Sequence, residues 1–474
     1  MTPRRAPILV AVIVLLLGAA LADRIVSPPG RAVALQTGPV MPSPAPAGAL
    51  SSTWYCAAGS AQADSPLAES VSIANPGSRP LTATIVVLTT DPKLAPPPKS
   101  IDLPPLSVRV VDLAADTPAT GAAGVVVQLD GGEAVVGHSI GKPAKTTDAC
   151  STGASDAWYF ADGSTAKDAT LQLALFNPFP EDAIADLSFV TDQGKAVPAD
   201  FQGLVVAART VRMVDVGQHV RRRDTVASTV TARSGRLVVD QVLTHTAAGL
   251  AGTSLTRGAT AVGSTWYLPN GVASATVTDT LVAYNPSVKE AQLDVTLSLD
   301  KGSAEPFELT VPAVGTVRLD LNHEARIPKD TPFSMTVTTT NGVPVVVQRI
   351  FVAAPPNRSG RSDTIAAART SRRWALPVGA ASDATDEWVT VQNPGRRPAT
   401  LSIAALAEGQ LVAIEGLQQL TVPAGGHASY RLGDHIKRDP LSVVVQASQP
   451  VVVEGSLFAV VGEGVTGTMA IPLP

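Results

Sequence analysis

The sequence is poor in charged and in aromatic side chains. Charged residues make up 16% of the 474 residues and aromatic residues 4%, whereas about a quarter of the residues in a soluble domain are usually charged. The formal net charge of −4 does not attract nucleic acid, so we expect no nucleic-acid partner. The longest basic cluster, at 221–223, is followed directly by Asp224 and is typical of a solvated loop.

Motifs for catalysis and cofactor binding are also scarce. The sequence has no phosphate-binding loop, no dinucleotide-binding fingerprint and no pair of histidines at zinc-binding spacing. Residues 137–141 match G-x-S-x-G, which in hydrolases presents a nucleophilic serine, here Ser139, on a turn from strand to helix. A loop containing Pro143 follows instead of a helix, so we interpret the match as a strand end. We predict no catalytic, cofactor-binding or metal-binding residues, and a protein that is not an enzyme.

Long helical stretches are missing as well, because 39 prolines and 38 glycines punctuate the chain. The exception is the N-terminus, where Arg4 and Arg5 precede an apolar stretch, a pattern typical of export signals. We expect residues 1–22 to be a signal peptide cleaved near Ala22 or an uncleaved membrane anchor. Both outcomes place the protein outside the cytoplasm, either secreted or anchored by a single span. The proline-rich residues 23–50 predict a stalk.

The sequence contains only two cysteines, Cys56 and Cys150. An even number of cysteines in an exported protein favours a disulfide, with two free thiols as the alternative. A bridge between them would close a loop of nearly 100 residues, which stabilises a fold by about 4 to 5 kcal/mol in the chain-entropy model.

Internal repetition is the strongest positive signal. A tryptophan followed by a tyrosine or alanine recurs at spacings of 104, 108 and 108 residues, at Trp54, Trp158, Trp266 and Trp374. A glycine follows each tryptophan five residues later, at Gly59, Gly163, Gly271 and Gly379. An Asn-Pro pair then follows in every copy, beginning at Asn75, Asn177, Asn285 and Asn393. A run of apolar residues ends each unit, at 134–136, 237–239, 345–347 and 451–453.

Alternating apolar and polar residues around each Asn-Pro pair predict strands with one buried face. Asparagine can bond its own backbone and proline cannot donate to a sheet, so each pair should end one strand. Units of this length with short strands predict an all-β chain of four tandem Ig-like β-sandwich domains. We expect the domains to cover residues 51–150, 151–262, 263–368 and 369–474. Arranged end to end, they would form a rod.

The repeated W-[YA]-x-x-x-G, φ-x-φ-x-N-P and late V-V-V patterns resemble those of an uncharacterised actinobacterial family of secreted or membrane-anchored proteins. The resemblance covers residues 51–474 and implies neither an activity nor a ligand. The fourth copy departs from the pattern because Ala375 stands in the place of the tyrosine.

We expect the four tryptophans to fill the cores. Adjacent strand residues face opposite sides, so Tyr55, Tyr159 and Tyr267 would point elsewhere, either to stack on a ligand or to pack at domain junctions. The leading hypothesis is a non-enzymatic cell-envelope scaffold or interaction protein whose partners are envelope proteins or glycans. The alternatives are a carbohydrate-binding module array that uses exposed aromatic residues and an accessory subunit of an envelope-assembly complex. An uncleaved N-terminal helix would add the membrane as a partner.

Overall fold

A computed structural model describes residues 41–141, 145–247, 251–300, 304–356, 358–407 and 409–474. Contacts divide the chain into Met1–Gln36 and Thr37–Pro474. The predicted signal or anchor segment, residues 1–22, and the first part of the predicted stalk lie outside the described residues. In the part of the chain that is described, no helix is long and apolar enough to cross a membrane.

The described residues consist of strands joined by loops and a few single helical turns, which confirms the all-β prediction. The strands fall into four successive groups, here called repeats 1 to 4. Repeat 1 contains β1 (Ser52–Cys56), β2 (Glu69–Asn75), β3 (Leu81–Thr89), η1 (Pro92–Leu94), β4 (Lys99–Leu103), β5 (Ser107–Asp112), α2 (Leu113–Asp116), β6 (Ala123–Leu129), β7 (Val135–Ile140) and β8 (Thr146–Ala149). Repeat 2 contains β9 (Ala157–Phe160), β10 (Ala169–Asn177), β11 (Ala183–Thr191), β12 (Gly194–Ala196), η2 (Ala199–Phe201), β13 (Leu204–Val206), β14 (Thr210–Asp215), η3 (Val216–Gln218), β15 (Val226–Ser234), β16 (Val238–His245) and β17 (Gly252–Arg257).

The remaining two repeats follow the same order. Repeat 3 contains β18 (Thr265–Val272), β19 (Val277–Asn285), β20 (Ala291–Leu299), β21 (Phe307–Val311), β22 (Gly315–Asp320), β23 (Pro332–Thr339), β24 (Val346–Ala353) and β25 (Gly360–Ile365). Repeat 4 contains β26 (Ser371–Leu376), β27 (Thr385–Gln392), β28 (Ala399–Ala407), β29 (Gln410–Ala413), β30 (Leu420–Val422), β31 (His427–Arg431), η4 (Leu432–Asp434), β32 (Val443–Ala459), β33 (Val465–Met469) and β34 (Ile471–Pro472).

Each of the first three repeats forms two antiparallel sheets. In repeat 1 the strand orders are β1-β6-β3-β4 and β5-β2-β7-β8, and repeats 2 and 3 have matching pairs of sheets. In repeat 4 the 17-residue strand β32 runs through both halves and joins them into one larger sheet. The two sheets of a repeat share an apolar core, to which Trp54 and Ile85 contribute from one sheet and Val71 and Val136 from the other.

The repeated tryptophans lie at the centres of these cores, where each is at most 1% exposed. In three of them the indole nitrogen donates to the carbonyl of the first residue in the apolar run that ends the repeat. Trp158 Nε1 donates to Leu237 O at 2.9 Å, Trp266 Nε1 to Val345 O at 3.1 Å and Trp374 Nε1 to Val451 O at 3.1 Å. The tryptophan and the late apolar run are therefore two halves of one contact.

The Asn-Pro pairs have a structural role that is the same in all four repeats. The strands β2, β10 and β19 end at the asparagine and β27 ends one residue earlier, which confirms that prediction. Asn177 Oδ1 accepts from Phe179 N at 3.1 Å, while its Nδ2 donates to Glu181 O at 2.8 Å and to Val206 O at 3.0 Å. The buried amide thus fixes its own turn and holds it against a second turn about 30 residues later. Equivalent bonds are made by Asn75, Asn285 and Asn393.

The repeated glycines allow another segment to approach closely. A Cβ on Gly271 would lie 2.3 Å from the ring of Phe333, and one on Gly59 would lie 1.9 Å from Glu69 Oε2. No larger residue fits at these two positions without moving its neighbour, which accounts for the recurrence.

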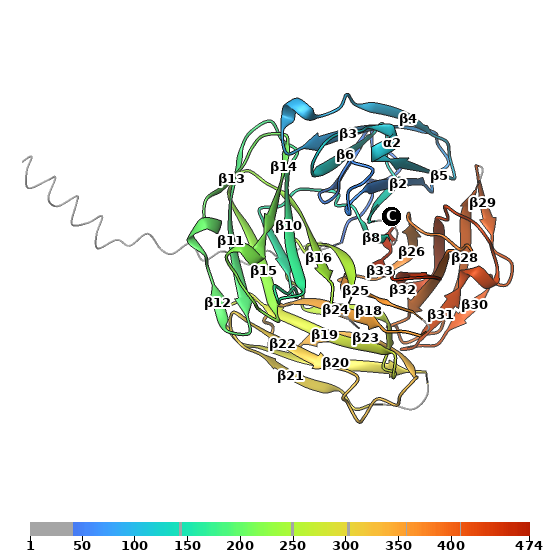
Figure 1. Cartoon of the computed structure of the whole chain (residues 1–474). Coiled ribbons are helices and arrows are strands. Elements are labelled where there is room, and N and C mark those ends of the chain that lie inside the picture. Colours follow the sequence, from blue (N-terminus) through green and yellow to red (C-terminus); the bar gives the residue numbers. More distant parts are fainter. Residues whose placement is uncertain (1–40, 142–144, 248–250, 301–303, 357, 408) are drawn as a thin grey trace, which may run out of the picture. The chain divides into compact units, whose positions relative to one another are not determined.

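The four repeats do not form a linear rod, so that expectation is wrong. Within Thr37–Pro474 the red repeat 4 lies beside the blue repeat 1 in Figure 1. Ala375, Leu406 and Val444 of repeat 4 share one apolar cluster with the core of repeat 1. Repeats 1 and 2 share a second cluster, which joins Ala58 and Val126 to the core of repeat 2. Apolar contacts therefore connect the last repeat back to the first.

The described end of the predicted stalk packs on repeat 1. Met41 is 5% exposed, and Ala45 O accepts a hydrogen bond from Glu133 N at 2.8 Å. Pro46 O would lie 2.0 Å from a Cβ on Gly132. A high proline content thus did not prevent residues 41–46 from packing, because Ala45 O bonds to the repeat and Met41, Pro42 and Pro44 are buried.

Candidate functional site

The polar chemistry of the protein is concentrated where the repeats meet. Each repeat contributes one edge strand near its end. These four strands are β8, β17, β25 and β33, and each lies at the edge of its own sheet. These four strands contact one another in a cycle, β8 with β17, β17 with β25, β25 with β33 and β33 with β8. We call this group the central strands.

Polar side chains, seven with a hydroxyl and one with a carboxylate, connect the central strands at two equivalent positions. The first position is occupied by Thr146, Ser254, Ser362 and Thr466, and the second by Asp148, Thr256, Thr364 and Thr468. All eight residues are at least half-buried, so their polar atoms need partners inside the protein.

At the first position, each side chain bonds to the backbone of the next central strand. Leu255 N donates to Thr146 Oγ1 at 3.2 Å, and Ser254 Oγ donates to Arg361 O at 3.3 Å. The cycle continues through Gly467 N, which donates to Ser362 Oγ at 2.7 Å, and through Thr147 N, which donates to Thr466 Oγ1 at 3.1 Å.

The second position repeats this arrangement. Arg257 N donates to Asp148 Oδ2 at 2.7 Å, and Thr256 Oγ1 donates to Asp363 O at 2.9 Å. Thr364 Oγ1 donates to Gly467 O at 3.0 Å, and Thr468 Oγ1 donates to Asp148 Oδ1 at 3.0 Å. Both sets of bonds run from repeat 1 through repeats 2, 3 and 4 and return to repeat 1.

A second set of contacts involves the residue that follows the paired valines of each repeat. This residue caps free backbone N–H groups just after the tryptophan strand of the preceding repeat. Asp240 Oδ2 accepts from Ala57 N at 2.7 Å and from Ala58 N at 3.2 Å. Gln348 Oε1 accepts from Ala161 N at 3.1 Å and from Asp162 N at 3.3 Å. In repeat 4, Glu454 accepts from the backbone of Asn270.

The contact between repeats 4 and 1, which we call the seam, has a glycine at this position instead. A Cβ on Gly137 would lie 2.8 Å from Val378 Cγ2 and 3.0 Å from Pro377 Cγ. Pro377, which stands where repeat 1 has Ala57, has no N–H to cap. Ser72 Oγ instead donates to Pro377 O at 2.6 Å.

One position after the capping residue, each strand carries a second residue, for example His138 or Arg349. This residue faces the capping residue of the following repeat. At the contact of repeats 1 and 2, His138 Nε2 lies 3.6 Å from Asp240 Oδ2. At the contact of repeats 3 and 4, Arg349 Nη2 lies 2.5 Å from Glu454 Oε1, and both side chains are at most 1% exposed. At the seam, the two equivalent residues are Gly455 and Gly137. The residues at these equivalent positions therefore differ in chemistry from one contact to the next.

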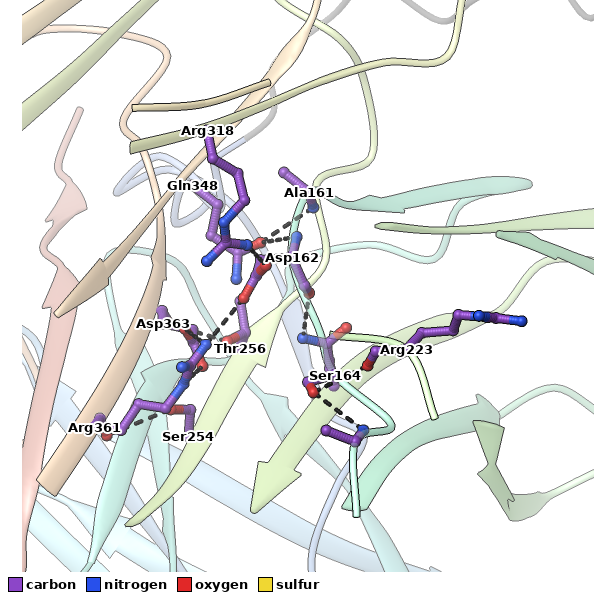
Figure 2. A network of polar contacts seen from close by, with 12 residues as sticks. Ala161, Asp162, Ser164, Arg223, Ser254, Thr256, Arg318, Gln348, Arg361 and Asp363 are labelled. Carbon is purple, nitrogen blue, oxygen red and sulfur yellow. Dashed lines mark hydrogen bonds and ion pairs between the residues drawn. The ribbon is translucent and has the colours of Figure 1, made fainter. Parts of the chain in front are cut away.

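A network of charged side chains lies between repeats 2 and 3 (Figure 2). Arg361 Nη2 lies 2.9 Å from Asp162 Oδ2 and 2.8 Å from Asp363 Oδ1, and Arg318 forms a further ion pair with Asp162. Burial raises the pKa of Asp162, and the nearby Arg318 and Arg361 oppose that rise. Burial also works against the charge of Arg361, but Asp363 and Asp162 outweigh it and raise the pKa of the guanidinium.

Burial changes the protonation of the carboxyl groups that have weaker partners. It raises the pKa of Asp240 to about 7 although the N–H of Ala57 opposes the shift, and it raises the pKa of Asp279 to about 7 against the nearby Arg349. Burial lowers the pKa of His138 to about 3, so its imidazole is neutral at neutral pH. Asp240 and His138 lie at the contact of repeats 1 and 2, and all three side chains are buried.

The seam also holds a cavity of about 440 Å³. Repeat 1 lines it with Ser70, Ser72 and Ser139, and repeat 4 contributes Phe458 and Val461. Val461 is 88% exposed and its neighbour Val460 is 51% exposed. The cavity therefore has hydroxyl groups inside and exposed apolar side chains at its edge.

The residues singled out from the sequence do not form one site. Cys56 and Cys150 form a disulfide, as predicted. Ser139 lies inside β7, where it pairs with Ser70 and Thr147 and is 5% exposed, so it does not have the exposed turn position of a hydrolase nucleophile.

The three tyrosines lie at or near the contacts between repeats. Tyr159 is 2% exposed, and burial raises its pKa to about 12 with a further contribution from Tyr284 of repeat 3. Tyr55 and Tyr267 are half-buried, and the ring of Tyr55 lies 6.4 Å from that of Phe179 in repeat 2. A stacking surface for sugars needs exposed rings, and Tyr159 does not provide one.

The polar residues of the central strands were not predicted, although the sequence contains a pattern that marks them. Each repeat ends with two polar residues of the type Ser, Thr or Asp separated by one position, at 146–148, 254–256, 362–364 and 466–468. The spacing from the paired valines varies, so the pattern is harder to align than the Asn-Pro pair.

Comparisons with known proteins identify no function. Residues 144–352, less than half of the chain, match the model of a family of unknown function (DUF5719). No curated protein matches the sequence. Among solved structures, the chain is similar to Thermotoga maritima 1070, with 21% identity over 22% of this chain and 93% of that one and a TM-score of 0.21.

Two further similarities are of the same kind. The Anabaena sensory rhodopsin transducer is 28% identical over 19% of this chain and 87% of its own, with a TM-score of 0.17. A tetra-tandem repeat from the extending region of a large adhesion protein is 13% identical over 87% of this chain and 96% of its own, with a TM-score of 0.11. TM-scores this low transfer neither a fold nor a function to the chain.

The buried pair Arg349–Glu454 should stabilise the fold more than an exposed pair of the same length. We expect Arg349→Ala to lower the free energy of unfolding by about 3 to 5 kcal/mol, because Glu454 is left buried without its partner. The control is Arg233→Ala, which breaks a pair with Asp186 that is also 2.5 Å long but has a half-exposed arginine. That change should cost much less, because solvent screens an exposed ion pair. Equal losses in urea denaturation would contradict the account.

Asp240 should make stability fall as pH rises. Its folded-state pKa of about 7 lies above its usual value of 3.8. The contribution of Asp240 to the free energy of unfolding is therefore complete below about pH 4 and is lost as pH rises through about 7. Asp240→Asn keeps an acceptor for Ala57 N but cannot ionise. We expect the variant to lose less unfolding free energy than the original chain between pH 5 and pH 8. Parallel profiles in urea denaturation would contradict this assignment.

Proposed function

We propose that this chain is a non-enzymatic extracytoplasmic scaffold or interaction protein of the cell envelope. Its four Ig-like β-sandwich domains would cover residues 51–150, 151–262, 263–368 and 369–474, behind an N-terminal signal peptide or membrane anchor. The observation that carries the proposal is that the buried polar groups bond from one repeat to another. Asp162, Asp240, Arg349 and Arg361 all bond across contacts between repeats, so they serve assembly of the chain.

The compartment is supported by two independent features. Arg4 and Arg5 before the apolar stretch are typical of export, and the disulfide Cys56–Cys150 persists in oxidising compartments. The match to a family of unknown function is compatible with the resemblance to uncharacterised secreted proteins. The burial of Tyr159 counts against an array of sugar-stacking modules.

The seam is the place where we expect a partner to bind. Exposed apolar side chains on a soluble domain often mark an interaction surface, and Val460 and Val461 adjoin the cavity with its hydroxyl groups. A partner there would be an envelope protein, since Val460 and Val461 are aliphatic and the ring of Phe458, which lines the cavity, is only 4% exposed and offers little surface for stacking on a glycan.

The test is photo-crosslinking in intact cells with a photoreactive amino acid at Val461 or at Val288. Val288 is a matched control because it is 84% exposed, against 88% for Val461, but belongs to a turn of repeat 3. We expect a discrete crosslinked envelope protein from position 461 and at least about fivefold less of it from position 288, because specific interfaces are local patches. Equal or absent crosslinking at both positions would contradict a partner at the seam.

Export is tested separately, with a reporter enzyme that is active only outside the cytoplasm fused after Pro474. The full chain should give reporter activity, and deletion of residues 2–22 should abolish it. Activity that survives the deletion would overturn the proposed localisation.

A further inference from the structure

The cavity at the seam has the size of a small-molecule site. Its volume of about 440 Å³ lies within the range of about 300 to 1,000 Å³ that is typical of ligand pockets. Residues of repeat 1 line one part of the cavity and residues of repeat 4 line the other. The cavity therefore exists only because the last repeat meets the first, and each of the two repeats contributes different chemistry.

Repeat 1 lines the cavity with a row of hydroxyl groups. Ser70 of β2 pairs with Ser139 of β7, and Ser139 pairs with Thr147 of β8. Residues paired across neighbouring strands lie on the same face of a sheet, and all three line the cavity. Thr147 is 1% exposed, and its Oγ1 has no hydrogen-bond partner among the described residues. A buried hydroxyl without a partner is unfavourable, so this one indicates a position for a polar ligand atom.

Charged groups of both signs line the same cavity. Repeat 1 contributes Lys145, whose Nζ donates to Ser70 Oγ at 3.5 Å, and repeat 4 contributes Asp439 and Glu463. All three residues are exposed, and none of them forms an ion pair with another described residue. An ammonium group beside a row of hydroxyl groups suits a carboxylate, and the carboxylates of repeat 4 suit an ammonium group.

The charged groups are placed at different parts of the cavity. Lys145 and Glu463 also line a neighbouring cavity of about 570 Å³, whereas Asp439 lines the seam cavity and not its neighbour. Lys145 and Asp439 are therefore separated, as the two charged groups of one ligand require.

Apolar side chains make up much of the remaining lining. Repeat 4 contributes Val378, Pro440, Leu457 and Phe458, and Val110 of repeat 1 adds an aliphatic side chain that is 44% exposed. An aliphatic group of a ligand would remove part of this surface from water, which is favourable.

We propose that the seam cavity binds a zwitterion with an aliphatic side chain, namely a free aliphatic amino acid. The carboxylate of the ligand contacts Lys145 and the hydroxyl of Thr147, and its ammonium group contacts Asp439. The aliphatic side chain packs on the apolar lining. This site goes beyond the proposed scaffold function, because it requires no second protein.

The test is isothermal titration calorimetry of the full chain, purified alone, with four probes. L-Leucine has both charges and the aliphatic group, isocaproate lacks the ammonium group, isoamylamine lacks the carboxylate, and glycine lacks the aliphatic group. We expect one leucine per chain and at least about tenfold weaker binding of the other three, since hydrogen bonds to charged groups contribute about a factor of ten or more. No binding of leucine, or equal binding of all four probes, would overturn the proposal.

Two variants that remove a charge distinguish the two ends of the ligand. Lys145→Met keeps the aliphatic stem and should weaken the binding of leucine and isocaproate at least about tenfold, with isoamylamine unchanged. Asp439→Asn should weaken leucine and isoamylamine to a similar extent, with isocaproate unchanged. Both residues are exposed, so we expect both variants to fold.

The matched control is Lys437→Met, which removes an ammonium group that is 65% exposed and lies outside the cavity lining. This variant should bind every probe like the original chain. Unchanged leucine binding in Lys145→Met and Asp439→Asn, or an equal loss in Lys437→Met, would contradict the assigned site. No envelope partner is present in these titrations, so their outcome is independent of the crosslinking at position 461.

Discussion

The constraint on which the structure depends is that buried edge strands must have partners for their backbone groups. The central strands β8, β17, β25 and β33 are edges of their own sheets, and an unpaired edge is unfavourable in the protein interior. Side chains such as Thr146, Thr256 and Thr466 supply those partners from the neighbouring repeat. The bonds run in one direction around four strands, so each repeat both gives and receives them, and the last repeat must meet the first.

The contacts between repeats share a geometry and differ in chemistry, which explains how four similar units keep their order. Asp240 caps N–H groups of repeat 1, and Gln348 does the same for repeat 2. The seam, where proline removes the N–H, has Gly137. Exchanging two repeats would leave an acid or an amide without its donor, or place a side chain where only a glycine fits. The distinct residues at one position therefore specify which repeat adjoins which.

Much of the fold within a repeat could be predicted from the sequence, because local patterns determine it. The tryptophans and Asn-Pro pairs recur at nearly constant spacing, and each acts within its own repeat, as Asn177 does on its turns. The contacts between repeats could not be predicted, because pairs such as Asp240–Ala57 and Arg349–Glu454 join residues more than 100 positions apart and their chemistry changes from one contact to the next. For the same reason, the approach of His138 to Cys56 and Cys150 has no sequence signal. Packing of residues 41–46 was missed because composition alone does not show which carbonyl groups find donors.

The most direct test of the closed arrangement is a crosslink between repeats 1 and 4. Thr146 Oγ1 and Thr466 Oγ1 lie 3.4 Å apart, so cysteines at both positions would bring their sulfur atoms within reach of a disulfide. The doubly substituted chain, Thr146→Cys with Thr466→Cys, should oxidise to a monomer with no free thiols that migrates faster on a non-reducing gel. A monomer that retains two free thiols under oxidising conditions would show that the first and last repeats do not meet.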